Sequence, residues 1–237
     1  MRALWSAMLD LFLPRACARC GEGVAGARVL CTRCAAALPR LPPGGCRLCQ
    51  GAAVGADGRC AACERGPLAQ VAAEVAFAGE AAEWIRRFKY PAAGLASLDA
   101  RPGALAAALL ADAARRLSEA EVDLVVAVPM HERRLRERGF HPAGELALAL
   151  SRTLRVPTDP RALAQIRPTA SQTGLDRRER RRNVRGAFAA GARARIPPRV
   201  ALVDDVVTTG ATLAEAARAL RRAGARRVVA VCVARTL

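Results

Sequence analysis

Residues 200–223 place a strand, two acidic residues, a hydroxyl-rich turn and a helix in direct succession, which constrains the fold more than any other feature of the chain. The apolar run 200–203 predicts a buried strand of a parallel sheet. The spacing of residues 213–223 predicts a helix that ends before Gly224. Between strand and helix lie Asp204, Asp205 and the sequence TTGAT at 208–212. This order is typical of α/β proteins that bind ligands at the carboxyl ends of their strands.

The segment has the donors and acceptors that a phosphorylated sugar requires. Free N–H groups at the helix start favour an anion, the threonine hydroxyls add donors, and Gly210 lets the backbone approach a phosphate closely. The two carboxylates can accept hydrogen bonds from vicinal ribose hydroxyls. Because neighbours in a regular strand point to opposite faces, we expect both carboxylates to lie beyond the regular end of the strand.

Two other structures can carry an acidic pair after an apolar strand. One is an ordinary acidic turn that caps a helix, since short motifs also arise by coincidence. The other is a Walker B strand of a P-loop NTPase, which requires a G-x-x-x-x-G-K-[ST] partner. The sequence contains no such partner, and its single lysine, Lys89, lies between Phe88 and Tyr90, so the NTPase interpretation is excluded.

Eight of the nine cysteines form four C-x-x-C pairs, namely Cys17/Cys20, Cys31/Cys34, Cys46/Cys49 and Cys60/Cys63. Two such pairs complete a closed tetrahedral Cys₄ shell, which is typical of structural zinc rather than catalytic zinc. The last two pairs repeat the first two at a constant offset, which favours two sequential zinc sites, with ligation across the repeats as the alternative. A disulfide framework is disfavoured by this regular pairing. We expect metal binding to supply much of the folding free energy of this module.

The remaining cysteine and the two histidines have simpler interpretations. Cys232 lies in the apolar run 228–233, which predicts a buried strand residue. His131 and His141 lack the spacing of a ligand set, and we expect neither to bind a metal.

The chain has 237 residues and a formal net charge of +17, which points to anionic partners such as phosphates, nucleic acid or an anionic membrane surface. No stretch is long enough to span a bilayer. Residues 1–13 can form a short amphipathic helix that packs on the protein itself, with docking to a membrane or partner as the alternative. Because these residues lack a secretory cleavage site, we expect a cytoplasmic protein.

The rest of the chain alternates predicted strands with predicted helices. We expect strands near residues 68–77, 122–128, 163–167, 187–188, 200–203 and 228–233, and helices near residues 80–90, 102–120, 142–154 and 213–223. This alternation predicts an α/β fold with a mostly parallel sheet. Two arginine-rich segments, 129–138 and 167–185, are expected at the ligand-binding edge, where guanidinium groups can pair with phosphates. A solvated basic helix face is an equal alternative for residues 177–182.

The segment 200–212 resembles the motif with which type I phosphoribosyltransferases bind phosphoribosyl pyrophosphate (PRPP). The resemblance implies that the acidic pair holds the ribose and the turn holds the 5′-phosphate. The PRPP-binding residues would be Asp204, Asp205, Val206, Thr208, Thr209, Gly210, Ala211 and Thr212, with Asp204 and Asp205 also as the catalytic pair. It further implies Mg²⁺ bound with PRPP, and a pyrophosphate loop and flap whose candidates are Met130, Arg133, Arg177 and Arg178.

The whole layout is similar to the ComF family of bacterial competence-associated proteins. The similar parts are the C-x-x-C pairs, residues 85–90, 126–129 with 138–140, 167–172, 182–188 and the PRPP-type motif. One departure is His141-Pro142, where the family has Asn-Gln. The resemblance implies a double zinc ribbon at 14–66 with two structural zinc ions, followed at 67–237 by a type I phosphoribosyltransferase fold. It also implies handling of single-stranded DNA in natural transformation or as a nutrient, with a competence helicase and recombination mediators as partners.

Two functions remain open at this point. DNA handling agrees with the net charge and would weaken steeply with salt, although aromatic residues for base stacking are few. Aromatic and basic residues alternate only at 84–90, where helical spacing makes Trp84 and Phe88 expected core residues. The alternative is an active phosphoribosyltransferase acting on an unidentified nitrogenous acceptor, with one carboxylate as general base. We favour DNA handling with a retained sugar-phosphate site.

Overall fold

The computed structural model of the chain describes residues 16–24, 29–41, 45–46, 49–51, 58–64, 66–90, 101–117, 122–169 and 176–237. The helix expected at residues 1–13 lies outside these ranges, as do residues 170–175 of the second arginine-rich segment. No helix within the described ranges is long and apolar enough to cross a bilayer.

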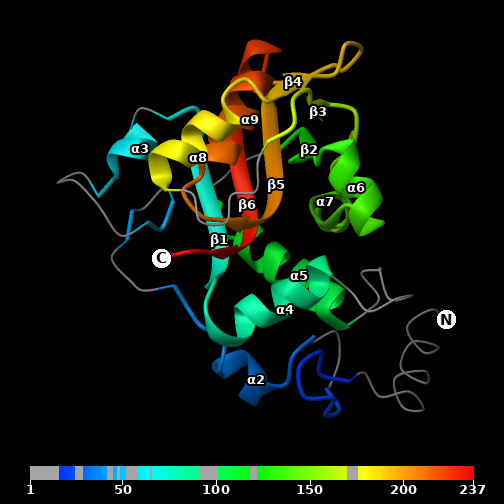
Figure 1. The fold of residues 1–237 in the computed structure, drawn as a ribbon. Coiled ribbons are helices and arrows are strands. Elements are labelled where there is room, and N and C mark those ends of the chain that lie inside the picture. The colour runs from blue at the N-terminus through cyan, green and yellow to red at the C-terminus, as the bar shows by residue number, and fades with distance from the viewer. Residues whose placement is uncertain are drawn as a thin grey trace.

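A four-stranded sheet forms the centre of the molecule (Figure 1), and its strands are β1 (Gln70–Ala76), β2 (Leu124–Ala127), β5 (Arg199–Val207) and β6 (Arg227–Arg235). Their order is β1–β6–β5–β2, and all three pairings are parallel. The strand residues are almost all buried and apolar, as a sheet covered on both faces requires. The predicted mostly parallel α/β sheet is therefore confirmed.

Two of the expected short strands lie outside the parallel sheet. Strands β3 (Leu163–Gln165) and β4 (Phe188–Ala190) pair antiparallel with each other, with Leu163 opposite Ala190. Three residues each cannot span the buried sheet, but a short antiparallel ladder suffices to tie together the segments before β5.

Helices cover both faces of the parallel sheet. Helices α5 (Arg101–Ala114) and α7 (Pro142–Leu154) pack on one face, and α4 (Gly79–Lys89) packs against α5. Helix α9 (Ala211–Arg222) packs on the other face, with α8 (Arg177–Val184) beside it. The remaining helices are α2 (Thr32–Ala36), α3 (Ala61–Glu64) and α6 (Glu132–Arg138).

The connections that follow β2 and β5 leave the sheet on opposite faces. The chain leaves β2 towards α7 on one face and leaves β5 directly into α9 on the other. Because β2 and β5 are neighbours, the diverging connections leave a crevice at the carboxyl ends of these two strands. Open α/β sheets bind their ligands at such a position.

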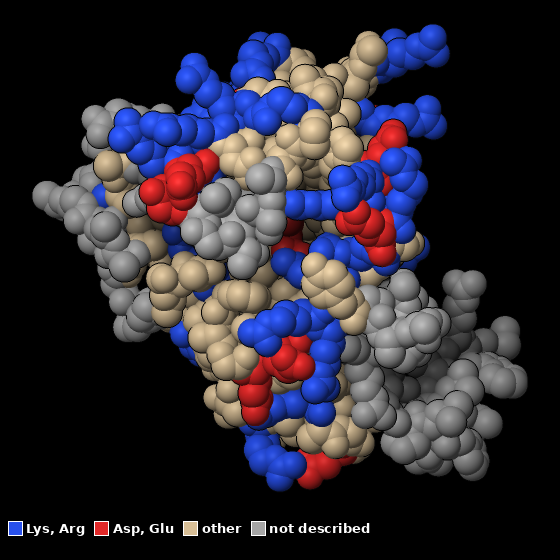
Figure 2. All heavy atoms as spheres, in the orientation of Figure 1, with Lys and Arg blue, Asp and Glu red and all other residues tan. Residues whose placement is uncertain are grey.

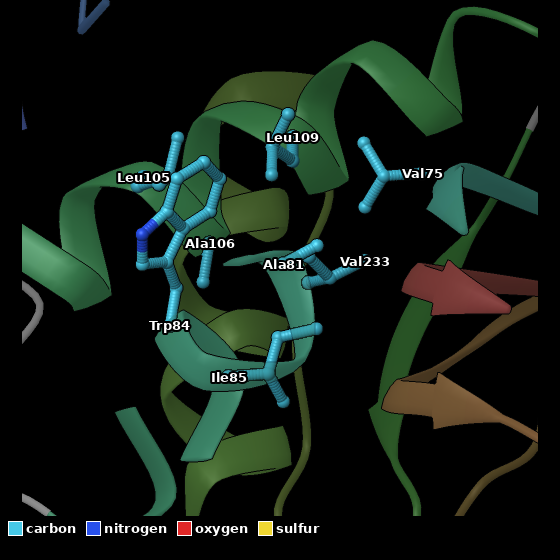
Figure 3. A pocket seen from close by; sticks show the side chains of 8 residues that line it. All are labelled: Val75, Ala81, Trp84, Ile85, Leu105, Ala106, Leu109 and Val233. Carbon is cyan, nitrogen blue, oxygen red and sulfur yellow. The ribbon is translucent and has the colours of Figure 1, made fainter. Parts of the chain in front are cut away.

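A small apolar gap lies between α4, α5 and the sheet (Figure 3). Trp84 and Leu105 border it together with Val75 and Val233, and its volume is about 10 Å³. This volume holds no more than one water molecule, so the gap is part of the core packing and not a ligand site. Phe88, one turn further along α4, is 5% exposed and belongs to the core as expected, whereas Trp84 is partly buried and packs against the edge of that core.

The cysteine-rich segment covers the edge of the sheet at β1. The N–H of Ala76 donates to the carbonyl of Pro39 at 2.7 Å, and the N–H of Ala73 donates to Gln50 Oε1 at 2.9 Å. Arg40 pairs antiparallel with Val75. An exposed strand edge is a template for unwanted pairing, so this module protects the sheet as well as extending it.

Candidate functional site: two Cys₄ clusters and an acidic cleft

The eight paired cysteines form two separate clusters. Within each cluster the four sulfur atoms lie within 4.8 Å of one another, and the clusters are Cys17, Cys20, Cys31, Cys34 and Cys46, Cys49, Cys60, Cys63. The ligand sets are therefore sequential rather than mixed across the repeats. The Sγ–Sγ distance is 3.8 Å between Cys20 and Cys31 and 3.7 Å between Cys49 and Cys60. Zinc–sulfur bonds of about 2.3 Å in a tetrahedron place sulfur atoms about 3.8 Å apart, so both clusters fit zinc.

The two clusters contact different parts of the sheet domain. The first lies near α4, where the Arg19 guanidinium lies 5.7 Å from the Trp84 ring and pairs with Glu80. The second is part of the sheet core, because Cys46 and Cys49 are buried beside Val71 and Ala73. Hydrogen bonding between the Cys49 and Cys63 thiols lowers the pKa of Cys49 to about 5 and raises the pKa of Cys63, so Cys49 is the first of the pair to ionise.

A cleft of about 430 Å³ opens at the carboxyl ends of β2 and β5. Its walls come from the end of α4, the segment after β2, helices α6, α7 and α8, and the turn between β5 and α9. Figure 2 shows a small acidic spot in a hollow at the centre of the view, with basic side chains next to it. The cleft therefore presents both signs of charge to a ligand.

Asp204 and Asp205 both line this cleft, although the expectation that they lie beyond the strand is wrong. Strand β5 continues to Val207, because its ladder with β6 runs on to the pair Val207–Arg235. On the other side the ladder with β2 ends at the pair Ala127–Val203. The acidic pair thus lies where one edge of β5 is free of a neighbouring strand, and the Asp204 carboxylate accepts the N–H of Asp205 at 2.9 Å.

A lysine from a distant helix neutralises part of this acidic charge. Lys89, the last residue of α4, has its Nζ 3.0 Å from Asp205 Oδ1. Burial, together with the neighbouring Asp205 charge, raises the pKa of Asp204 to about 7. The two carboxyl groups thus have different environments: Asp204 has a raised pKa, and Asp205 pairs with Lys89.

The raised pKa of Asp204 makes the stability of the protein depend on pH. A carboxyl with a folded-state pKa above its unfolded value adds stability that is complete below the unfolded pKa and is lost as the pH rises through the folded pKa. We expect Asp204→Asn, which cannot ionise, to unfold at a higher temperature than the wild type at pH 8.5, by about 3 °C or more. The difference should shrink at pH 5.5. Thermal unfolding at both pH values tests this, and an equal difference at the two values would contradict it.

The turn after β5 brings a left-handed glycine and the start of a helix to the cleft. Gly210 has a φ of 73°, a left-handed conformation that other residues adopt only with strain, and helix α9 begins at the next residue, Ala211. Thr208, Gly210, Ala211 and Thr212 line the cleft, as does Val206. The Thr209 hydroxyl oxygen instead accepts the N–H of Ala211 at 3.4 Å, which stabilises the turn.

The structure brings only some of the proposed pyrophosphate and flap residues to the cleft. Met130 lines it, but Arg133 pairs with Glu137 at 2.9 Å on the exposed side of α6. Arg178 is exposed and is not among the described lining residues, and the side chain of Arg177 lies outside the described residues.

Three other arginines line the cleft, namely Arg134, Arg138 and Arg180. They lie in the two arginine-rich segments expected at this edge, although they are not among the individually named candidates. Arg134 and Arg138 are four residues apart on α6 and so share one face, whereas Arg133 and Glu137 share another. The four-residue spacing of Arg134 and Arg138 can be read from the sequence and predicts that the two side chains share a helix face. Lys89 ends α4 and Tyr90 follows it, and both also line the cleft. Their local sequence does not predict that they meet residues of β5 and α6.

Both histidines have roles in backbone hydrogen bonding. His131 caps α6, where its Nδ1 accepts the N–H of Arg133 at 3.3 Å. His141 precedes α7, and its Nε2 lies 3.0 Å from the carbonyl oxygen of Val128. Burial lowers the pKa of His141, so the ring is held neutral against the end of β2.

Comparison with known proteins shows similarity over about half of the chain. No family model matches it. It is 42% identical over 118 residues to the DNA utilization protein YhgH of Escherichia coli (strain K12), an alignment that covers 48% of this chain and 50% of that protein. It is 36% identical over 108 residues to competence protein F of Haemophilus influenzae, an alignment that covers 45% of this chain and 47% of that protein. The chain thus spans about half the length of the curated relatives it matches.

One solved structure that aligns with the chain is the glutamine PRPP amidotransferase from B. subtilis complexed with ADP and GMP. The TM-score is 0.34 and the identity is 24%, over 51% of this chain and 23% of that chain.

Proposed function

We propose that this chain, a homologue of competence protein F and of the DNA utilization proteins, binds PRPP or a related sugar phosphate in the cleft and handles single-stranded DNA during its uptake. The observation that carries the proposal is the convergence of an acidic pair, a glycine-centred anion turn and several guanidinium groups on one cleft. In this assignment residues 14–66 are a double zinc ribbon with structural zinc, and residues 67–237 are a phosphoribosyltransferase-like domain.

Each part of PRPP has a matching group in the cleft. The carboxylates of Asp204 and Asp205 accept hydrogen bonds from the ribose hydroxyls. The turn at 208–212 holds the 5′-phosphate through backbone N–H groups and threonine hydroxyls. Arg134, Arg138 and Arg180 face the pyrophosphate, and Mg²⁺ bound with PRPP neutralises the rest of its charge.

Basic surfaces outside the cleft support the DNA part of the proposal. Figure 2 shows basic side chains gathered over the end of the molecule that carries α8, α9 and β4. Arg218, Arg221 and Arg222 of α9 border a second hollow of about 390 Å³ there. Such a surface attracts phosphate backbones in a salt-dependent manner. A cytoplasmic location and contact with a competence helicase or a recombination mediator belong to the same proposal.

Calorimetry and filter binding test the two parts of the proposal separately. Titration of Mg·PRPP into zinc-loaded protein should give saturable heat, and ribose 5-phosphate and pyrophosphate should each bind more weakly because each fills only part of the cleft. A labelled oligonucleotide should be retained on filters at low salt and released as the salt rises. Absence of heat with PRPP would overturn the sugar-phosphate part, and salt-independent or absent retention would overturn the DNA part.

An active phosphoribosyltransferase is the second candidate function. The observation that favours it is that the Asp204 carboxyl lines the cleft beside Asp205. Burial and the Asp205 charge raise its pKa to about 7, which suits a general base towards a nitrogenous acceptor. Release of pyrophosphate from PRPP in the presence of nucleobases would support transfer. If no acceptor gives pyrophosphate above the rate of the Asp204→Asn/Asp205→Asn variant, transfer is excluded.

Lys89→Met is expected to weaken PRPP binding about tenfold. The substitution keeps the length of the side chain but removes the cation that pairs with Asp205, so the carboxylates repel an anionic ligand more strongly. Lys89→Arg should retain most of the affinity because it retains the charge. Calorimetry at fixed ionic strength measures both variants, and equal affinities for wild type and Lys89→Met would contradict the role of the ion pair.

A further inference from the structure

Tyr90 is a large aromatic residue on the surface at the rim of the cleft. It is the only tyrosine of the chain, it follows α4 directly, and it is 67% exposed. Trp84 and Phe88, the other aromatic residues of this segment, pack against or within the core instead. The exposed ring of Tyr90 therefore makes little contribution to packing, although it lines the same cleft as the acidic pair.

Arg138 of α6 holds the Tyr90 ring in place. Its guanidinium carbon lies 4.6 Å from the centre of the ring, and its Nη2 donates a hydrogen bond to the Tyr90 hydroxyl at 2.9 Å. The pair joins two segments that are 48 residues apart in the sequence. The guanidinium lies over the ring, and Tyr90 nevertheless remains 67% exposed. Arg138 thus fixes the orientation of the Tyr90 ring and places a positive charge beside it, and we call this fixed ring the platform.

A second guanidinium lies close to this platform. Arg134 is one helical turn before Arg138 on α6, and its Nη2 donates to the carbonyl of Thr169 at 3.4 Å. Both arginines line the cleft. Next to an aromatic face, they supply the phosphate contacts that single-stranded nucleic acid makes beside a stacked base.

We propose that Tyr90 and Arg138 form a stacking site for a base of single-stranded DNA at the rim of the sugar-phosphate cleft, an inference that rests on the proposed DNA function. The strand must be single because the bases of a duplex are stacked on each other and cannot reach an aromatic side chain. The site should tolerate any base, because every base has a π-face that can stack and no side chain needs to hydrogen-bond to the edge of the base. Phosphates flanking the stacked base lie against Arg134 and Arg138.

An oligonucleotide with one central 2-aminopurine tests the stacking directly, because the fluorescence of this base is quenched when it stacks. Wild-type protein should quench the probe on binding. Tyr90→Ala should lose the quenching and bind about tenfold more weakly, whereas Tyr90→Phe, which keeps the ring, should retain both within about twofold. Ile166→Ala is the matched control, because Ile166 is also a large exposed side chain, at 64%, and is not among the cleft residues. On α6, Arg138→Ala should weaken binding more than Arg133→Ala.

The outcomes separate this inference from the proposed function. If the wild type binds DNA and Tyr90→Ala binds and quenches equally well, the stacking site is refuted while DNA handling stands. If the wild type fails to bind the probe at low salt, the DNA function itself is refuted, and the stacking site with it. Zinc content and thermal unfolding of Tyr90→Ala should match the wild type, which shows that the variant is folded.

Discussion

Cys46→Ser should remove about one of two bound zinc ions and lower the free energy of unfolding by more than about 3 kcal/mol. Cys46 is fully buried, and its cluster is continuous with the core of the sheet. Gln50, whose side chain accepts the N–H of Ala73, follows the first C-x-x-C turn of this cluster directly. Loss of the metal therefore exposes apolar surface and leaves a strand edge without its partners.

Zinc content and calorimetric unfolding measure this effect, with Cys232→Ala as the control. Cys232 is also fully buried but lies in β6 outside both clusters, so its substitution should keep both zinc ions and cost only about 1 kcal/mol. Cys20→Ser, in the exposed part of the first cluster, should lower the zinc content equally but affect the sheet less. Equal stability of Cys46→Ser and Cys232→Ala would contradict a structural metal in the second cluster.

Asp204→Asn/Asp205→Asn is expected to weaken PRPP binding by a factor of about 100 or more. Each carboxylate would give the ribose a charge-assisted hydrogen bond of about 1.5–3 kcal/mol, and two such losses reach this factor. The variant should remain folded, because Asp204 is a desolvated acid whose charge costs stability. Glu132→Gln is the matched control, since the Glu132 side chain is 85% exposed and is not among the cleft residues.

DNA binding by the same double variant shows whether the two activities share one site. We expect the oligonucleotide to bind as well as before, because its contacts are with arginines and Tyr90 rather than with the acidic pair. Loss of both ligands together would mean instead that DNA binding also depends on the acidic pair. PRPP affinity equal to that of Glu132→Gln would contradict the role of the carboxylates.

The positions of most helices and strands can be predicted from the sequence. The spacing of hydrophobic residues, and the glycine and proline residues that end an element, are local properties of the sequence. Helix α7 has the expected bounds, and Gly224 after α9 has a φ of 115°, as expected of a residue that ends a helix. The end of β5 was misplaced because two adjacent charges normally end a buried strand. The strand continues because β6 remains beside it for four more residues, a neighbour that the local sequence does not reveal.

The candidate site was predictable where it lies within one segment and not where distant segments meet. The acidic pair and the turn at 208–212 are contiguous, so their chemistry can be recognised together. Lys89 reaches Asp205 across more than 100 residues of sequence, and the tertiary packing of α4 on α5 and the core brings it there. In the same way, the C-x-x-C spacing predicts two metal clusters, but it does not predict that the segment around them covers the edge of β1.

A crystal of the zinc-loaded protein soaked in Mg·PRPP tests the central claim most directly. The account predicts difference density for the 5′-phosphate on the turn at 208–212, for the ribose hydroxyls on Asp204 and Asp205, and for pyrophosphate beside Arg134 and Arg138. An empty cleft at saturating ligand, or density bound only to surface arginines of α8 and α9, would contradict it.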